Sequence, residues 1–220
     1  AESEPYTYVW DTTLGLGEHG DQHALSASAE DIAGNVSFAQ PILVTVSDTE
    51  ENHSLGFDGM DDYVNVQYGV DLDMSNALTI AAWVKPIYNN EESTIAMKGS
   101  YGYGFALTNN GTSNCSSNNE PNLVYWDQGD CGQAINSSIT YEFDQWQHVA
   151  VTAEDVGNQL EIYFYVNGEQ DGPYYSDELS ISNGGDSMAL MIGIQWGGWN
   201  VFYGNIDDLA IWNAALSAGQ

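Results

Sequence analysis

The chain has 220 residues, 43% of them hydrophobic, which is enough to bury the core of one large β-sandwich plus a smaller piece. Its 32 acidic residues face only two basic ones, Lys85 and Lys98, so the formal net charge is −30. This charge argues against nucleic acid and anionic membrane surfaces as partners, because both are bound through lysine and arginine. It also favours a salty or calcium-rich medium, in which cations screen the self-repulsion.

Two features of the sequence bear on where the protein works. No run of about 18 apolar residues is present, so we expect no membrane insertion. The N-terminal segment AESEPYTYVW lacks a basic stretch followed by an apolar run, and we interpret the chain as mature or excised material, so the missing signal peptide does not argue for the cytoplasm. The sequence therefore predicts an extracellular protein, either secreted or attached to a cell surface.

Segments typical of β-strands follow one another along the chain, and almost nothing is typical of a helix. They are rich in Val, Ile, Tyr, Trp and Phe, and Gly, Asn, Asp and Ser separate them. The predicted strands are Tyr6–Trp10, His23–Glu30, Ile42–Val46, Tyr63–Val66, Leu78–Val84, Gly104–Leu107, Leu123–Trp126, His148–Thr152, Glu161–Val166, Ala189–Ile194 and Asn205–Trp212. Short strands at this spacing predict an all-β fold, a sandwich or a barrel.

Two local signals organise this series of strands. The polar segment Ser47–Ser54 marks a boundary, which divides the chain into predicted domains at residues 1–48 and 49–220. Asn167-Gly168, between two strand-like runs, is typical of a β-hairpin with a type I′ turn.

The first domain carries the motifs Tyr6–Thr13, Gly20–Leu25, Ala29–Asn35 and Ile42–Val46. In order and spacing they resemble the last strands of bacterial Ig-like repeats. The resemblance covers only the second half of such a domain, and half a sandwich exposes an apolar face and an unpaired strand edge. Either the chain is a fragment of a longer protein, or another chain supplies the missing strands.

The second domain carries a longer series of motifs: Leu55–Val64, Leu78–Pro86, Tyr103–Leu107, Trp146–Thr152, Tyr165–Gly168, Met191–Gly193, Gly204–Asn213 and Ala215–Ser217. Together, residues 55–217 resemble the laminin-G-like, concanavalin A-like lectin-glucanase superfamily. The resemblance implies a jelly-roll β-sandwich. It also implies that Trp83, Trp146 and Trp212 pack in the core.

The two cysteines of the chain, Cys115 and Cys131, lie in polar, loop-like sequence. An even number of cysteines in an exported chain favours one disulfide. The bond would close a loop of about 15 residues, which the chain-entropy account values at roughly 3 kcal/mol. Two free, buried thiols are the alternative.

Acidic residues gather at a predicted turn and again in a late strand. Asp58, Asp61 and Asp62 surround a glycine, and Asp207 is followed by Asp208. Strict alternation along the late strand would point one of the latter two carboxylates at an apolar layer, where it needs a hydrogen-bond donor or a cation. A carboxylate network bonded to backbone amides is one explanation. The resemblance implies the other, a structural calcium that joins the turn and the strand through Asp58, Asp62, Asp207 and Asp208.

Aromatic and amide side chains in predicted loops suggest a carbohydrate site. Aromatic rings can stack on the apolar face of a sugar, while polar side chains bind its hydroxyl groups. Gly197-Gly198 between two tryptophans predicts an exposed aromatic loop. The candidate sugar-binding residues are Tyr101, Trp126, Trp196, Trp199 and Asn200. The alternative is that these aromatic side chains belong to the core or the rim of the sandwich.

A catalytic site is not expected. Glucanases on this fold carry an acid–x–acid–x–x–acid strand, which places two carboxylates in a cleft. Glu142 and Asp144 match the first two positions, but Gln147 stands at the third. His148 is most simply a structural histidine, and no Gly-x-Ser-x-Gly motif is present.

The sequence thus predicts a non-catalytic extracellular module that binds carbohydrate or mediates adhesion and is stabilised by calcium. Its expected partner is a glycan or polysaccharide. The alternative is a structural repeat or subunit of a cell-surface fibre or filament, assembled by strand complementation of the incomplete Ig-like half and therefore self-associating.

Overall fold

The computed structural model describes residues 22–25, 28–30, 34, 36–38, 42–45, 54–89, 91–109, 120–126, 134–177, 179–185 and 187–218. Contacts between Cα atoms divide the chain into two units, residues 1–53 and 54–220. The predicted strand Tyr6–Trp10 and the predicted disulfide between Cys115 and Cys131 fall outside the described residues. Among the described residues, no helical segment has both the length and the hydropathy of a membrane-spanning helix.

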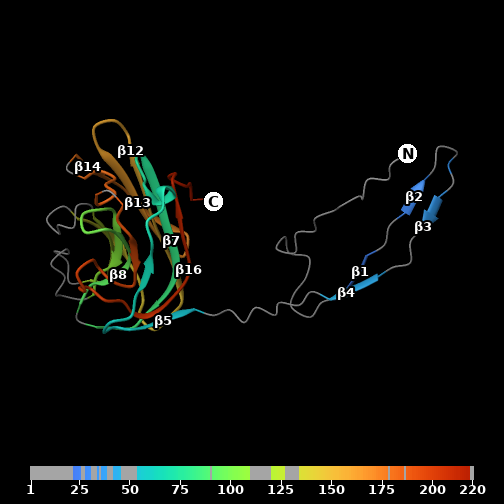
Figure 1. Ribbon diagram of the computed structural model, residues 1–220, viewed down its shortest axis with the longest axis horizontal. Coiled ribbons are helices and arrows are strands. Elements are labelled where there is room, and N and C mark those ends of the chain that lie inside the picture. The colour runs from blue at the N-terminus through green and yellow to red at the C-terminus, as the bar shows by residue number, and fades with distance from the viewer. Residues whose placement is uncertain are drawn as a thin grey trace. The chain divides into compact units, whose positions relative to one another are not determined.

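In the first unit, the described strands form two antiparallel pairs (Figure 1). β1 (Gln22–Leu25) pairs with β4 (Ile42–Thr45), and β2 (Ser28–Glu30) pairs with β3 (Val36–Phe38). The single strand predicted over His23–Glu30 is therefore two strands, each with its own partner. A two-stranded pair by itself is only marginally stable in water.

The second unit consists of two six-stranded antiparallel sheets. The first, called the β7 sheet, has the order β14 (Glu169–Ser176), β13 (Leu160–Val166), β12 (Gln147–Asp155), β7 (Ala77–Pro86), β16 (Tyr203–Trp212) and β5 (Leu55–Asp58). The second, called the β8 sheet, has the order β11 (Ile135–Thr140), β10 (Asn122–Trp126), β9 (Gly104–Leu107), β8 (Ser93–Lys98), β15 (Leu190–Ile192) and β6 (Val64–Val66). One short 3-10 helix, η1 (Val70–Leu72), precedes β7.

The main core of this unit is built from alternate residues of the strands. Leu78, Ile80, Ala82 and Val84 of β7 are all fully buried in it. Core residues of the β8 sheet, such as Phe105, belong to the same cluster. Burying each large aliphatic or aromatic side chain contributes about 1.5–3 kcal/mol. The predicted all-β jelly-roll sandwich is confirmed.

The hairpin predicted at Asn167-Gly168 is also confirmed. These two residues connect β13 to β14, with φ values of 51° and 80°, as a type I′ turn requires. The side chain of Asn167 has a second role, because its Oδ1 accepts a hydrogen bond from the backbone N–H of His148 (3.0 Å). The turn is thereby attached to the start of β12.

Candidate functional site

The most exposed aromatic ring among the predicted sugar-binding residues lies in a closed loop between β15 and β16. This segment, residues 195–200, is called the tryptophan loop. The backbone N–H of Gln195 donates to the carbonyl of Trp199 (2.9 Å), and the N–H of Gly198 donates to the carbonyl of Gln195 (3.1 Å). Two cross-loop hydrogen bonds within five residues hold the loop in one conformation.

The two glycines allow the loop to present its tryptophans. Gly197 and Gly198 have φ values of 97° and 90°, in the region that favours glycine. A Cβ atom on Gly197 would lie 3.3 Å from Cδ1 of Trp199, so the indole ring packs directly over the glycine backbone. Trp199 is 72% exposed and Trp196 is 42% exposed. The expectation of an exposed aromatic loop is met at these two residues.

Asn200 anchors the loop to the sandwich. Its side-chain amide Nδ2 donates to Oε1 of Gln195 (2.8 Å) and to Oε1 of Glu92 (3.3 Å). Its backbone carbonyl accepts from the backbone N–H of Thr94 (2.9 Å). Glu92 is only 2% exposed. Because both amide hydrogens of Asn200 point into the structure, its Oδ1 is the atom that could accept a hydrogen bond from a ligand hydroxyl, and Nε2 of Gln195 is the neighbouring donor.

Glu92 was not among the predicted site residues. It stands in the polar run Glu91–Ser93, which gives no sign that one of its two acidic side chains is buried. Only the folded chain identifies it, through its position beneath Asn200.

The structure does not bring Tyr101 and Trp126 to the tryptophan loop. Tyr101 is 65% exposed, but it follows the last residue of β8, whereas Asn200 contacts Thr94 near the start of that strand. Trp126 ends β10 and is 1% exposed, packed with Met97 in a small cluster of buried side chains. The predicted strand Leu123–Trp126 is thus confirmed, whereas the placement of Trp126 among the loop aromatics is wrong, and its ring is not open to a ligand.

At the end of β5, three of the predicted acidic residues come together. Carboxylate oxygens of Asp58, Asp61 and Asp62 lie within 4.8 Å of one another, and all three side chains are exposed. Asp62 Oδ2 accepts from the N–H of Asp58 (3.0 Å), and Asp58 Oδ1 accepts from the N–H of Met60 (2.8 Å). Three convergent carboxylates at a surface turn suit Ca²⁺, which takes six to eight oxygen ligands in flexible geometry and can complete its shell with water.

Asp207 and Asp208 lie away from that turn. Asp58 of β5 pairs with Tyr203 of β16, and Asp207 lies four residues further along β16. At the rise of a β-strand, the backbone of Asp207 is therefore about 13 Å from that of Tyr203, the partner of Asp58. Asp207 Oδ1 instead accepts from the N–H of Asp208 (2.9 Å).

A β-bulge changes the expected alternation in β16. Asp207 lies opposite Trp83 and Ala210 lies opposite Ala81, so two residues of β16 face one residue of β7, and Asp208 has a φ of 46°. As a result Leu209 packs against the core, while Asp208 is exposed. The expectation that one of the two carboxylates faces an apolar layer is therefore wrong.

The acidic residues considered for catalysis do not lie on a strand. Glu142 and Asp144 are exposed residues of the turn before β12. Gln147 is 5% exposed and closes this turn: its Oε1 accepts from the N–H of Glu142 (3.1 Å), and its Nε2 donates to the carbonyl of Glu142 (2.6 Å). Gln147 therefore has a structural role.

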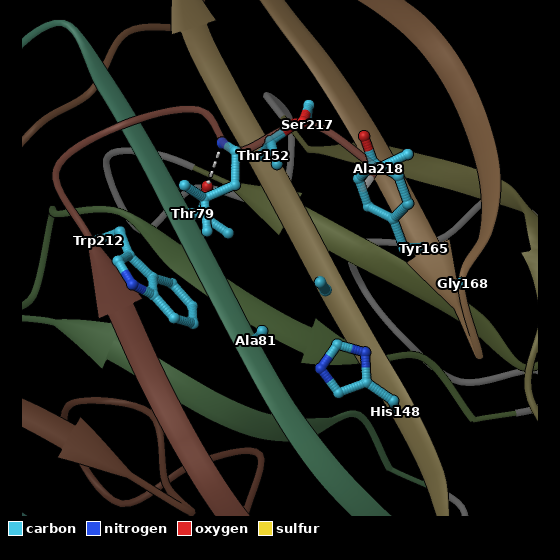
Figure 2. A pocket seen from close by; sticks show the side chains of 11 residues that line it. Thr79, Ala81, His148, Thr152, Tyr165, Gly168, Trp212, Ser217 and Ala218 are labelled. Atoms are coloured by element: carbon cyan, nitrogen blue, oxygen red, sulfur yellow. Dashed lines mark hydrogen bonds between the residues drawn. The ribbon is translucent and has the colours of Figure 1, made fainter. Parts of the chain in front are cut away.

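A shallow hollow of about 140 Å³ lies on the outer side of the β7 sheet (Figure 2). Ala81 and Ala150 contribute small side chains, and the rings of His148, Tyr165 and Trp212 surround them. Chain from the C-terminal end crosses one edge, where Thr79 Oγ1 donates to the carbonyl of Ala214 (2.6 Å) and accepts from the N–H of Leu216 (2.9 Å).

Three tryptophans that were expected in the core are partly exposed. Trp83, Trp146 and Trp212 are 40%, 42% and 39% exposed, so the prediction that they pack in the core is wrong. The ring of Trp83 instead meets His148 edge to face, at 5.6 Å between centroids. Burial lowers the pKa of His148.

Comparison with known proteins identifies the family of the second unit. A laminin-G model, described as the concanavalin A-like lectin/glucanases superfamily, matches residues 58–220. The chain belongs to this superfamily. No curated protein matches its sequence. The match begins after the first unit, so the Ig-like resemblance of that unit stays a prediction.

Three solved structures share the fold of this superfamily member. A Bacteroides ovatus protein provisionally assigned to carbohydrate binding has a TM-score of 0.56 at 18% identity, over 92% of this chain and 56% of its own length. The CBM40 of the Ruminococcus gnavus IT-sialidase, bound to α2,3-sialyllactose, has a TM-score of 0.52 at 14% identity, over 76% of this chain and 95% of its own length. A heptameric SAP-like pentraxin from Limulus polyphemus has a TM-score of 0.50 at 19% identity, over 74% and 76%.

Proposed function

We propose that the second unit is a non-catalytic, extracellular carbohydrate-binding or adhesion module and that its glycan site is the tryptophan loop. The observation that carries this proposal is the exposure of Trp199 and Trp196 on a hydrogen-bonded loop beside two amide side chains, those of Asn200 and Gln195. An indole ring offers a flat apolar surface to the C–H face of a sugar, and the amides offer one donor and one acceptor to its hydroxyl groups.

The similar structures support a carbohydrate ligand in this fold. One of them is bound to sialyllactose, and another is assigned to carbohydrate binding. Fold likeness alone does not determine a ligand, and the tryptophan loop is the feature of this chain that suits a sugar. The absence of catalysis is supported by the structural use of Gln147 and by the exposed turn positions of Glu142 and Asp144.

The test is a glycan array probed with three proteins: the unmodified chain, Trp199→Ala and Trp212→Ala. Trp212 is the matched control, since it is a partly exposed tryptophan at the opposite end of β16 from the loop. We expect Trp199→Ala to lose binding and Trp212→Ala to keep it. Loss with Trp212→Ala alone would move the site to the hollow of the β7 sheet, and an array without any binding would reject the carbohydrate function.

A calcium ion held at the Asp58–Asp61–Asp62 turn is the second part of this proposal. The three exposed carboxylates fit the ion, which would hold the end of β5 in place and offset part of the negative charge. Gly59 of this turn packs closely against Tyr203: a Cβ atom added to Gly59 would lie 3.0 Å from the Cβ of Tyr203. Ordering the turn would therefore also stiffen the start of β16.

A structural role in a fibre is the second candidate function. The observation that favours it is in the first unit, where the described strands pair as β1 with β4 and β2 with β3. Such pairs gain stability from a further strand donated by another chain. Multi-angle light scattering of the purified chain tests this role: large assemblies would support it, and a monomer at all concentrations would reject it.

A further inference from the structure

We infer that the tryptophan loop selects neutral glycans and rejects acidic ones such as sialylated sugars or uronic-acid polymers. This inference rests on the proposed function and names the class of ligand for the same site. It follows from the number of cationic side chains in the chain, from where the structure places them, and from the acidic group that contacts the loop.

Carboxylate-bearing sugars are bound most strongly where a cationic side chain is available. Proteins bind carboxylates mainly through arginine, whose planar fork matches the two oxygens, or through lysine. The chain has only two basic residues in its full sequence, Lys85 and Lys98, and neither is an arginine. A ligand carboxylate that leaves water without such a partner can exchange its hydration only for neutral donors, which compensate the loss less well than an ion pair does.

Neither lysine serves the loop. Lys98 is fully buried, with Nζ 3.2 Å from Asp73 Oδ1 and 2.6 Å from the carbonyl oxygen of Met188. Lys85 lies in β7 opposite Asn205 and alternates with buried Val84 and Pro86, which directs it to the outer side of the β7 sheet together with Trp83. The loop is anchored elsewhere, at Thr94 of β8.

The acidic side chain that contacts the loop is Glu92. Glu92 Oε1 lies 3.3 Å from Nδ2 of Asn200, and the side chain is 2% exposed. In its ionised form this carboxyl group would repel a ligand carboxylate bound above it, and in its neutral form it would supply no positive charge to attract one. The remaining polar groups of the loop, the amides of Gln195 and Asn200, are neutral and suit hydroxyl groups.

The net charge of −30 also disfavours acidic ligands, and it acts over a longer range than the contacts of the loop. It lowers the local concentration of any polyanion at low ionic strength, and salt weakens this effect. A neutral glycan experiences neither the field nor the contact repulsion. The fold neighbour bound to sialyllactose therefore shares the architecture of this chain but, on this inference, not its ligand class.

The experiment compares matched neutral and acidic ligands. Affinity electrophoresis and titration calorimetry of the unmodified chain at pH 8 would use lactose against α2,3-sialyllactose and galactan against polygalacturonate, each in EDTA and in millimolar Ca²⁺. We expect the neutral member of a pair to bind and the acidic member to bind at least tenfold more weakly. Acidic ligands bound as tightly as neutral ones in EDTA, or bound only when Ca²⁺ bridges them, would overturn the inference while leaving the carbohydrate function in place. Absence of binding to every member here and to every neutral and acidic glycan of the array would reject the carbohydrate function itself, and the inference with it.

Two variants, each replacing an acid by its amide, test whether Glu92 contributes to the preference for neutral over acidic glycans. Glu92→Gln keeps an oxygen for Asn200 and removes the buried acid, whereas Glu154→Gln makes the same change at an exposed position of β12. We expect Glu92→Gln to reduce the preference for neutral over acidic ligands roughly threefold to tenfold, and Glu154→Gln to leave it unchanged. An equal effect of the two variants would reject the role of Glu92, and the comparison on the unmodified chain remains decisive if Glu92→Gln fails to fold.

Discussion

Nζ of Lys98 and Oδ1 of Asp73 lie 3.2 Å apart, with the lysine fully buried and the aspartate about one-third exposed. The ammonium also lies 5.0 Å from the centroid of the Tyr68 ring, and Tyr68 Oη donates to Asp73 Oδ2 (3.0 Å). One buried cation thus joins β8, the segment between β6 and η1, and the residue that follows η1. In a protein with only two lysines, this one is used for structure.

Removing the cation should destabilise the second unit strongly. Lys98→Met keeps most of the volume but leaves Asp73 without its counter-ion, and breaking such a pair costs on the order of 2–4 kcal/mol when one partner is partly solvated. Urea denaturation measures the loss. Lys85→Met is the control, because Lys85 is half-buried and we expect it to change the free energy of unfolding by less than about 0.5 kcal/mol. Equal effects of the two substitutions would contradict this role of Lys98.

The glycan site should depend on Gly197 more than the fold does. Gly197→Ala forces a Cβ into a left-handed position at 3.3 Å from Trp199, so we expect loss of glycan binding and a loss of stability of about 1 kcal/mol. Gly157→Ala is the matched control, with a φ of 115° and no atom within 4 Å of the added Cβ. It should lower stability to a similar extent and leave glycan binding intact. Binding that survives in both variants would mean that the position of Trp199 does not matter.

Calcium should stabilise the chain through the turn after β5. At a concentration 100 times its dissociation constant, a ligand that binds only the folded state adds about 2.7 kcal/mol, so we expect a rise in melting temperature that saturates and that EDTA reverses. NaCl of equal ionic strength controls for charge screening. Asp58→Asn should abolish the saturable rise, whereas Asp208→Asn, in the bulge, should not. The opposite pattern would place the ion at the late strand.

Stability between pH 5 and pH 7.5 should carry a contribution from His148. Burial lowers its pKa below the ordinary value of 6.5, so in this range the unfolded chain binds more protons at this residue than the folded chain. The contribution is fully present above about pH 6.5 and is lost as the pH falls through that value toward the lower pKa of the folded state. We expect His148→Gln to flatten the pH dependence of the free energy of unfolding by less than about 1 kcal/mol, because the side chain is half-buried. A steeper dependence in the variant would reject this assignment.

Local sequence patterns were sufficient for much of the fold. The Asn167-Gly168 hairpin follows from two residues that tolerate positive φ, and β9 has the predicted bounds Gly104–Leu107. The strand β8 was missed, because its residues from Ser93 to Lys98 are all buried and show no alternation of polar and apolar positions. A short strand that is buried on both faces and mixes polar with apolar residues cannot be distinguished from a loop by its periodicity.

For this protein, the sequence alone determined the all-β class, the extreme negative charge with two lysines, and a Trp-Gly-Gly-Trp segment suited to an exposed turn. Only the tertiary structure decided which aromatic rings are exposed: it buried Trp126, exposed Trp83 and Trp212, and packed Trp199 over Gly197. It also turned Asp208 outward through a bulge and placed the acid of Glu92 beneath Asn200. The physical reason is that exposure, register shifts and contacts between distant residues depend on how the two sheets and their connections pack, and no short stretch of sequence contains that information.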